Sequence, residues 1–125
     1  MKIKTIEDIQ DFERIQSQLR SLHEELGLLS KKTPNDSVNI FKLKLINSII
    51  SQANNFFDKR NLPFDDFNQF DIEEMPSNSD VVLILGQYIN CMDEGKIEYI
   101  RKKFGRWYWC LDKKETEIIT SEPKK

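Results

Sequence analysis

The residues capable of nucleophilic or metal-binding chemistry are few and scattered along the chain. The one histidine, His23, is followed by two glutamates, but an HExxH zinc motif needs a second histidine where Gly27 stands. The two cysteines, Cys91 and Cys110, are separated by a long stretch with no ligand motif. A cysteine nucleophile would need His23 to approach one of them in the fold. The sequence therefore predicts no metal site, no cofactor and structural roles for both cysteines.

Loops that bind phosphate through glycine are also absent from the sequence. It contains no GxGxxG or GxxxxGK[ST] pattern and no GxSxG nucleophile elbow. Without a nucleophile, phosphate or metal signature, the sequence favours a non-catalytic protein. An enzyme that uses a pair of carboxylates from its acidic stretch is the third alternative.

An acidic segment, defined as residues 61–80, contains carboxylates but no lysine or arginine. Within it, Phe64, Phe67 and Phe70 recur at every third position. A short helical turn would direct these rings to the core and leave the acids in water. The absence of a glycine at the required position excludes an EF-hand calcium loop.

Recognition of another protein is the functional interpretation of this acidic segment. Acids arranged around aromatic rings could dock on a basic, grooved partner, because complementary charge sets both the rate and the choice of association. The residues predicted to bind this protein partner are Phe64, Asp65, Asp66, Phe67, Phe70, Glu73 and Glu74.

Basic and aromatic residues alternate over residues 101–109. Such a pattern can hold a phosphate backbone and stack on bases. The residues predicted to bind nucleic acid in this alternative are Arg101, Lys102, Lys103, Arg106, Trp107 and Trp109. The structural interpretation is that the cations complement a helix C-terminus and the tryptophans cover a core. Both interpretations are open.

Composition limits the classes of partner. The chain has 125 residues, of which 38% are hydrophobic and 32% charged, with a formal charge of −2. This balance excludes a generally basic nucleic-acid coat protein, although it permits a local basic patch. The apolar run over residues 81–92 is shorter than the roughly 20 residues that a membrane span needs, and no signal-peptide pattern is present. We expect a cytoplasmic protein with no membrane partner, since a secreted disulfide scaffold would contain more cysteine.

The first two blocks of sequence have the periodicity of amphipathic helices. Over residues 5–30, Thr5 and Asp8 have capping-box spacing, and apolar residues follow at intervals of three and four. A bundle helix is favoured over a coiled coil, which needs more heptads. In the second block Ser37 is the expected N-cap, and the helix is expected to end at residues 58–60.

The third block is expected to be a helix that is buried on most sides. Ser77 and Asp80 have capping-box spacing at its start. Its apolar pattern continues as far as Phe104, with Gly95 as a point of kinking or breaking.

Beyond residue 105 the hydrophobic period changes from that of a helix to that of a strand. Alternating aromatic and β-branched residues predict a hairpin of residues 107–111 and 116–120, with its turn at residues 112–115. The turn signal is weak, because no glycine or asparagine supplies positive φ. A lone hairpin is marginally stable in water, so it must pack on the helices.

The sequence therefore predicts a mainly α fold: a small bundle of three or four helices with a C-terminal β-hairpin or extended segment. We expect a single helical domain over residues 1–120 and a flexible tail over residues 121–125. The predicted core residues are Leu19, Leu22, Leu26, Phe41, Leu45, Ile49, Phe56, Leu83, Ile84, Tyr88, Ile97 and Ile100.

The expected function is that of a non-catalytic cytosolic interaction module, such as an adaptor, inhibitor or regulatory subunit. It would bind a protein partner, or a second copy of itself, through the acidic segment. The alternative is a nucleic-acid-binding regulator that uses residues 101–109.

Overall fold

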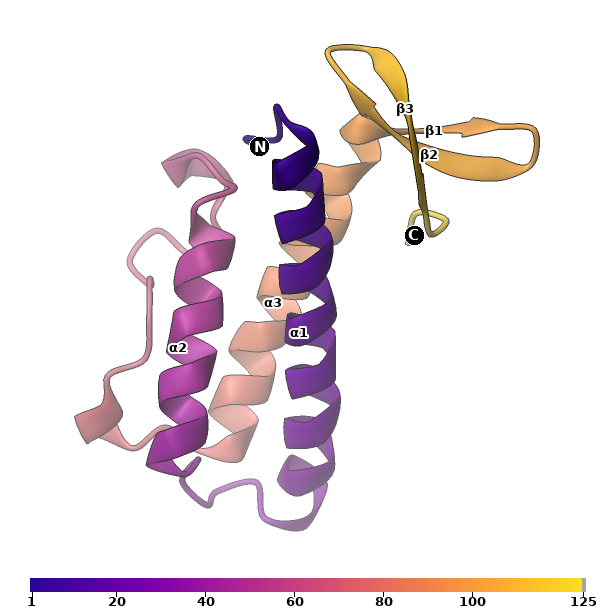
Figure 1. Cartoon of the computed structure of the whole chain (residues 1–125). Helices are drawn as coiled ribbons and strands as arrows, with labels where there is room; N and C mark the ends of the chain where they lie inside the picture. The colour runs from indigo at the N-terminus through magenta and orange to yellow at the C-terminus, as the bar shows by residue number, and fades with distance from the viewer. Residues whose placement is uncertain (125) are drawn as a thin grey trace.

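The computed structural model describes residues 1–124, which form three α-helices followed by a three-stranded antiparallel sheet (Figure 1). The predicted class, a mainly helical chain with a small bundle, is confirmed, and the C-terminal hairpin is part of a larger sheet. The elements are α1 (Ile6–Lys32), α2 (Ile40–Asn54), α3 (Asn78–Lys96), β1 (Ile100–Lys103), β2 (Arg106–Leu111) and β3 (Lys114–Thr120). Short 3₁₀ turns lie at Lys59–Asn61, Ile72–Glu74 and Ile97–Tyr99.

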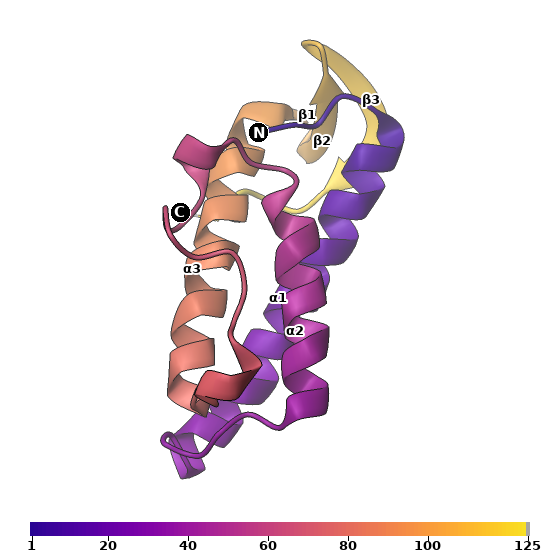
Figure 2. The same cartoon turned by 90° about the vertical axis from the view of Figure 1, so that its left-hand side faces the viewer.

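Helices α2 and α3 run in the same direction, and both are antiparallel to α1 (Figures 1 and 2). Consecutive parallel helices cannot be joined by a tight turn, because the chain must first return along the length of the bundle. The stretch between Asn54 and Asn78 makes this return along the outside of α2 and α3 (Figure 1). The acidic segment is therefore the crossover connection of the bundle.

Side-chain caps define the starts of the helices. The expected capping boxes are confirmed: Thr5 and Asp8 begin α1, and Ser77 and Asp80 begin α3. The expected Ser37 cap of α2 is wrong, because Asn39 caps this helix by accepting from the Lys42 amide at 2.8 Å. Ser37 instead forms a β-bridge with Ser77, which ties the starts of α2 and α3 together.

The end of α2 differs from the expectation of residues 58–60. The helix ends at Asn54, and Phe56 and Phe57 turn into the core. Phe56 packs edge-on against Phe12 of α1 with ring centroids 5.4 Å apart, and its carbonyl oxygen accepts from the Lys2 amide at 2.8 Å. These tertiary contacts engage the Phe56 ring and its carbonyl oxygen, so they compete with continuation of the helix past Asn54.

The prediction that the third helix continues to Phe104 is wrong. Helix α3 ends at Lys96, just after Gly95, and Ile100 begins a strand that pairs with Trp109 of β2. The basic residues 101–103 therefore lie on a strand and not at a helix C-terminus. Apolar periodicity does not distinguish a helix from a strand at Ile100, because a buried isoleucine is compatible with both.

Both hairpin turns are built from residues with positive φ. Phe104 (φ 51°) and Gly105 (φ 78°) connect β1 to β2, while Asp112 (φ 49°) and Lys113 (φ 65°) connect β2 to β3. Positive φ at both central residues is the feature of type I′ turns, whose twist matches that of a hairpin. The expected second turn at residues 112–115 is therefore shorter than predicted.

The core prediction is correct for α1 and partly wrong for α2 and α3. Of the expected core residues, Leu19, Leu26, Phe56, Tyr88 and Ile100 are buried, and Leu22, Ile49 and Ile84 are half-buried. Four are exposed: Phe41, Leu45, Leu83 and Ile97.

The four errors have a common physical cause. Each helix buries one face: α2 buries Leu43, Ile46 and Ile50, and α3 buries Val81 and Leu85 along the same kind of stripe. Apolar side chains on the other faces have no element to cover them. A sequence that is apolar all round does not show which face the bundle covers.

The predicted tail over residues 121–125 makes at least one contact with the bundle. Ser121 Oγ accepts from the buried Lys96 Nζ at 3.3 Å, and Lys125 lies outside the described residues. Along residues 1–124 no helix has the length and apolar character needed to cross a membrane.

The positive φ at Lys113 generates a stability prediction. Left-handed backbone strains a residue with a Cβ atom, so Lys113→Gly should raise the free energy of unfolding by about 0.5–1 kcal/mol. The matched control is Lys114→Gly in β3, where the backbone is extended and glycine should lower stability by a similar amount. Urea unfolding measures both, and equal destabilisation by the two variants would contradict the strain argument.

Candidate interaction surfaces

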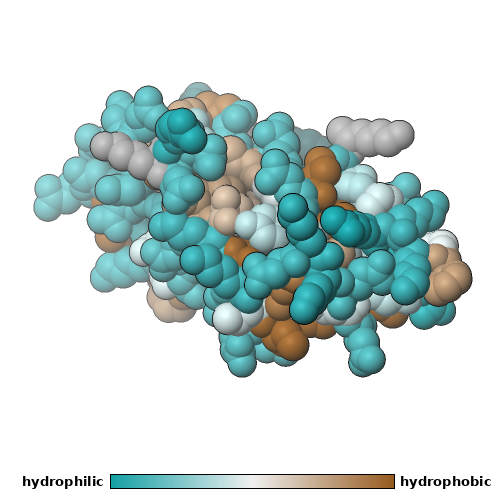
Figure 3. All heavy atoms as spheres, turned by 90° about the horizontal axis from the view of Figure 1, so that it is seen from above, coloured by the Kyte–Doolittle hydropathy of each residue, from teal (hydrophilic) through white to brown (hydrophobic). Residues whose placement is uncertain are grey.

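Two oppositely charged surfaces lie on different sides of the molecule. The acidic segment runs along the outside of α2 and α3, whereas the β1–β2 hairpin extends from the other side of the bundle, beyond α1 (Figure 1). Seen from the sheet end, the surface is mostly hydrophilic, with small apolar areas between charged side chains (Figure 3).

The three phenylalanines of the acidic segment pack inward, as one interpretation of the sequence predicted. Phe67 lies 6.3 Å from Phe64, 5.0 Å from Phe70 and 6.4 Å from Tyr88 of α3, measured between ring centroids. Phe70 is buried, and Phe64 and Phe67 are half-buried. The predicted helical turn is absent from residues 64–70, so bends in the chain direct the rings instead. The rings hold the crossover on the bundle.

Asparagine side chains of α2 fix the path of the acidic segment. Asn47 donates to the Phe70 carbonyl oxygen at 2.9 Å and accepts from the Phe70 amide at 2.8 Å. Asn54 donates to the Asn68 carbonyl oxygen at 3.1 Å and accepts from the Tyr88 hydroxyl at 2.6 Å. Burial raises the pKa of Tyr88 to about 12. Sequence reasoning missed both asparagines, although polar residues of low helix propensity within an apolar helix are the signal for such a role.

The carboxylates of the acidic segment face water. All six are exposed, and Asp80 caps α3. The other five form no ion pair with another residue in the described part of the chain: Asp65, Asp66, Asp71, Glu73 and Glu74. Beside them Met75 is 64% exposed and has a φ of 51°. With the predicted rings largely turned away from water, the exposed part of the segment thus consists of the acids, Met75 and three polar residues: Asn61, Asn68 and Gln69.

The second surface is the basic hairpin, defined as residues 101–107. It carries four exposed cations: Arg101, Lys102, Lys103 and Arg106. Lys103 pairs with Glu115 of β3 at 3.2 Å and lies 5.6 Å from the ring centroid of Phe104. Phe104 is 90% exposed at the turn, so the hairpin presents an aromatic ring at its tip.

The two tryptophans have different environments. Trp109 is completely buried and packs edge-on against Phe12 of α1, with ring centroids 5.4 Å apart. It has no free face on which a base could stack, and its role is to cover the core. Trp107 is half-buried and borders a cavity at the base of the basic hairpin. Of the two rings, Trp107 is the one that a ligand can reach.

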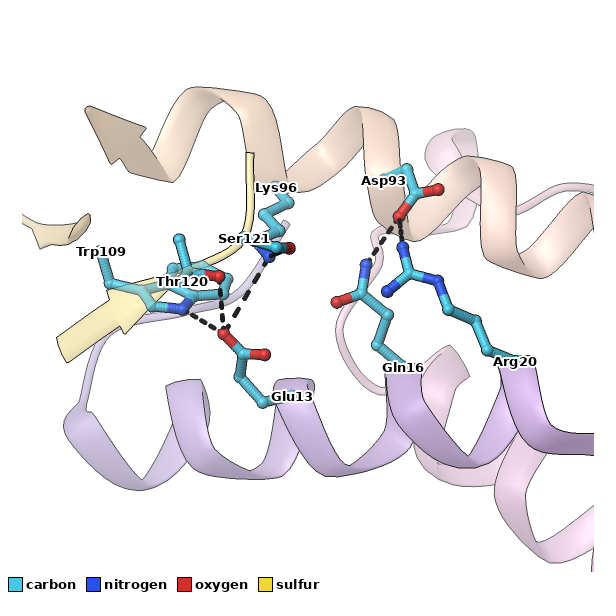
Figure 4. Close-up of polar contacts among 8 residues, drawn as sticks. All are labelled: Glu13, Gln16, Arg20, Asp93, Lys96, Trp109, Thr120 and Ser121. Atoms are coloured by element: carbon cyan, nitrogen blue, oxygen red, sulfur yellow. Dashed lines mark hydrogen bonds and ion pairs between the residues drawn. The ribbon is translucent and has the colours of Figure 1, made fainter. Parts of the chain in front are cut away.

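A partly buried polar network attaches the sheet to the helices, and Figure 4 shows its donors converging on one carboxylate. Glu13 Oε1 of α1 accepts from Trp109 Nε1 at 2.6 Å and from Thr120 Oγ1 at 2.8 Å. Lys96 Nζ of α3 lies 4.0 Å from the same oxygen and 5.3 Å from the Trp109 ring centroid. Burial lowers the pKa of Lys96, while Glu13 opposes this shift. The network joins α1, α3, β2 and β3.

A second polar cluster strengthens the contact between α1 and α3. Asp93 accepts from Gln16 Nε2 at 2.7 Å and pairs with Arg20 (Figure 4). Gln16 is buried, and this bond satisfies its amide. Among the described residues, no buried side-chain nitrogen or oxygen lacks a hydrogen-bond partner. The buried polar side chains of the described residues are thus hydrogen-bonded within the protein, and none is left without a partner for a ligand to satisfy.

The groups considered for catalysis do not form a catalytic arrangement. Burial raises the pKa of Cys91 and Cys110, which keeps both as thiols. His23 lies against Gly86 of α3. Over residues 1–124, no three histidine, cysteine, aspartate or glutamate side chains gather as metal ligands would.

One cavity of about 350 Å³ is lined by two acids, although neither comes from the acidic segment that the third alternative uses. Glu94 and Glu98 line it beside Cys91 and Gly95. Both glutamates are exposed to water, so their environments do not separate them into an acid and a base.

No family model, curated protein or solved structure matches this chain. The two charged surfaces are therefore the features from which function is inferred.

Substitution of Glu13 and Lys96, the two charged residues of the network that attaches the sheet, should have unequal effects on stability. Glu13→Ala should lower the free energy of unfolding by about 2 kcal/mol or more, because Trp109 Nε1 loses its acceptor and Lys96 loses its counter-charge inside the protein. Lys96→Met should change stability by less than about 1 kcal/mol, since it removes a buried charge at similar volume.

Urea unfolding followed by tryptophan fluorescence tests this prediction. The control is Glu24→Ala on the exposed face of α1, which should have almost no effect. Equal costs for Glu13→Ala and Glu24→Ala would show that the network does not hold the sheet.

Proposed function

We propose that the protein is a non-catalytic interaction module and that the basic hairpin is its binding surface for nucleic-acid phosphates. The carrying observation is the set of four exposed cations on a hairpin that extends beyond the helices (Figure 1). Within residues 1–124 only Lys103 of the four is in an ion pair. Unpaired lysine and arginine side chains that release counterions from phosphate are the main source of affinity for nucleic acid.

The distribution of charge supports this proposal more than the net charge does. The chain is slightly acidic overall, but a cluster of exposed acids lies along the crossover, on the other side of the bundle from the hairpin (Figure 1). Two further exposed acids, Glu117 and Glu122, lie closer to the hairpin, on β3 and just after it. A polyanion would repel the acidic segment and attract the hairpin, which orients the molecule as it approaches. A small number of phosphate contacts gives moderate affinity with strong salt dependence, as expected of a regulator that binds reversibly.

The structure of the hairpin also suits this function. Paired strands hold the cations at fixed intervals, and β2 is anchored in the core by Trp109. A two-stranded ribbon is narrow enough to enter the major groove of DNA or to follow a single strand. The exposed Phe104 ring provides an additional stacking surface at the tip.

Salt dependence tests the proposal quantitatively. Each phosphate that a cation neutralises contributes about −0.9 to the slope of log K against log salt for a duplex, so four cations should give a slope between about −2 and −4. Lys102→Gln or Arg106→Gln should each reduce the magnitude of this slope by about 1. Fluorescence anisotropy with a labelled oligonucleotide at several salt concentrations measures both quantities.

The control variants are Lys31→Gln and Lys32→Gln, which remove exposed charges at the end of α1 far from the sheet (Figure 1). They should leave the slope unchanged. Binding that is insensitive to salt, or that weakens equally in control and hairpin variants, would refute the role of the basic hairpin.

A second candidate function is the docking of a basic protein on the acidic segment. It is favoured by the five exposed carboxylates and by the neighbouring exposed Met75. In this proposal the acids supply charge complementarity and Met75 supplies the apolar contact, whereas the phenylalanines hold the segment in place. The partner could be a separate protein or the basic hairpin of a second copy.

A paired capture experiment tests the second candidate. The tagged protein is incubated with nuclease-treated extract of the cells that express it, alongside Asp65→Asn/Asp66→Asn and the control Glu24→Gln/Glu25→Gln, whose acids are exposed on α1. A stoichiometric protein retained by the wild type and the control but lost from the Asp65/Asp66 variant is the expected result. Retention by all three would show that the acidic segment is not the docking surface.

A further inference from the structure

One face of the sheet continues beyond the part that the helices cover. Paired residues on antiparallel strands share a face, and so do residues two apart on one strand. Ile100 pairs with Trp109, and both are buried against the bundle. Two residues further out, Lys102 pairs with Trp107, which in turn pairs with Thr120. Lys102, Trp107 and Thr120 thus form a row across the three strands, on the same face as the core residues.

This outer row borders a shallow cavity of about 360 Å³. The cavity is lined by Lys102, Gly105, Arg106, Trp107, Ile119, Thr120 and Glu122. The strand register places Arg106 and Ile119 on the opposite face of the sheet from Lys102, Trp107 and Thr120. The β1–β2 hairpin extends past α1, so no helix lies over its outer part (Figure 1). The cavity lies where the face of the sheet that packs on the core is no longer covered by a helix. This explains why the Trp107 side chain is only half-buried there. The volume of the cavity lies at the lower end of the range for ligand pockets.

The chemistry of the lining restricts the occupant. A bare phosphate would meet Lys102, but also the Glu122 carboxylate, which repels it. An aromatic base that carries a phosphate fits all of these groups: the base stacks on Trp107, its amino or ring N–H groups donate to Glu122, and the phosphate meets a cation. Gly105 has no neighbouring atom within 4 Å of a Cβ position, so the turn leaves room for a backbone to pass.

We infer that this cavity binds one unpaired nucleobase of a single strand, stacked on Trp107, with the adjoining phosphate at Lys102, which pairs with Trp107 across the strands. The inference rests on the proposed function of the basic hairpin, and it adds that the hairpin prefers single strands to duplexes. A paired base cannot enter, because its faces and its hydrogen-bonding edge are occupied within the duplex. The protein should therefore bind single strands more tightly than duplexes of the same length.

The test compares a labelled 12-nucleotide single strand with its duplex, using wild type, Trp107→Leu and the control Tyr108→Leu. Tyr108 is the next residue along β2 and faces the opposite side of the sheet. Trp107→Leu should weaken single-strand binding at least ten-fold, which corresponds to the loss of one stacked base, and leave duplex binding unchanged. Tyr108→Leu should change neither. Thermal unfolding of each variant confirms that it is folded.

The outcomes separate the inference from the function on which it rests. If both nucleic acids bind equally and Trp107→Leu has no effect, the cavity is not a base site, but the basic hairpin remains a phosphate-binding surface. If neither binds, the proposed function fails as well. A nucleoside monophosphate that binds as tightly as the single strand would assign the cavity to a free nucleotide and overturn the inference for single strands.

Discussion

The arrangement of this molecule depends on one carboxylate, that of Glu13, which accepts hydrogen bonds from two strands and faces the buried ammonium of α3. A small sheet has too little apolar area to be stable alone, so it must be attached to the bundle. Trp109 makes the apolar contact with Phe12 of α1. Glu13 fixes the orientation of the sheet on the bundle, because Trp109 and Thr120 must both point their donors at its carboxylate. The rigid attachment of β2 then determines where the basic hairpin extends.

The direction of the helices imposes a second constraint, and the acidic surface is its consequence. Because α2 and α3 run in parallel, a long crossover must lie along the bundle and be held there. Aromatic rings and the amides of Asn47 and Asn54 hold it from within, so the acids between the rings are left facing water. The acidic segment is thus explained largely by packing, and this is why its carboxylates alone support a weaker proposal than the hairpin does.

Local signals predicted much of the fold, and long-range contacts explain what they missed. Both capping boxes and the three helical blocks follow from spacing within a few residues. The exposed Phe41 and Leu83 and the strand that starts at Ile100 depend on which neighbour each side chain meets, and periodicity contains no such information. Asp112 and Lys113 form a type I′ turn without the usual residues, since pairing of β2 with β3 outweighs the local strain. Glu13 could not be singled out, because its partners are far away in sequence.

The same reasoning separates the two tryptophans, which alternate along one strand and which the sequence treats alike. They share a face of the sheet, but Trp109 is completely buried against Phe12 of α1, whereas Trp107 packs against the edge of the core and borders an open cavity. A ring that is buried in the core and a ring that borders an open cavity can thus lie two residues apart on one strand. The basic residues of β1 and of the adjoining turn flank the second ring and not the first. Cations beside an accessible aromatic ring are the combination that single-strand recognition uses, and here the geometry of the helix ends creates it.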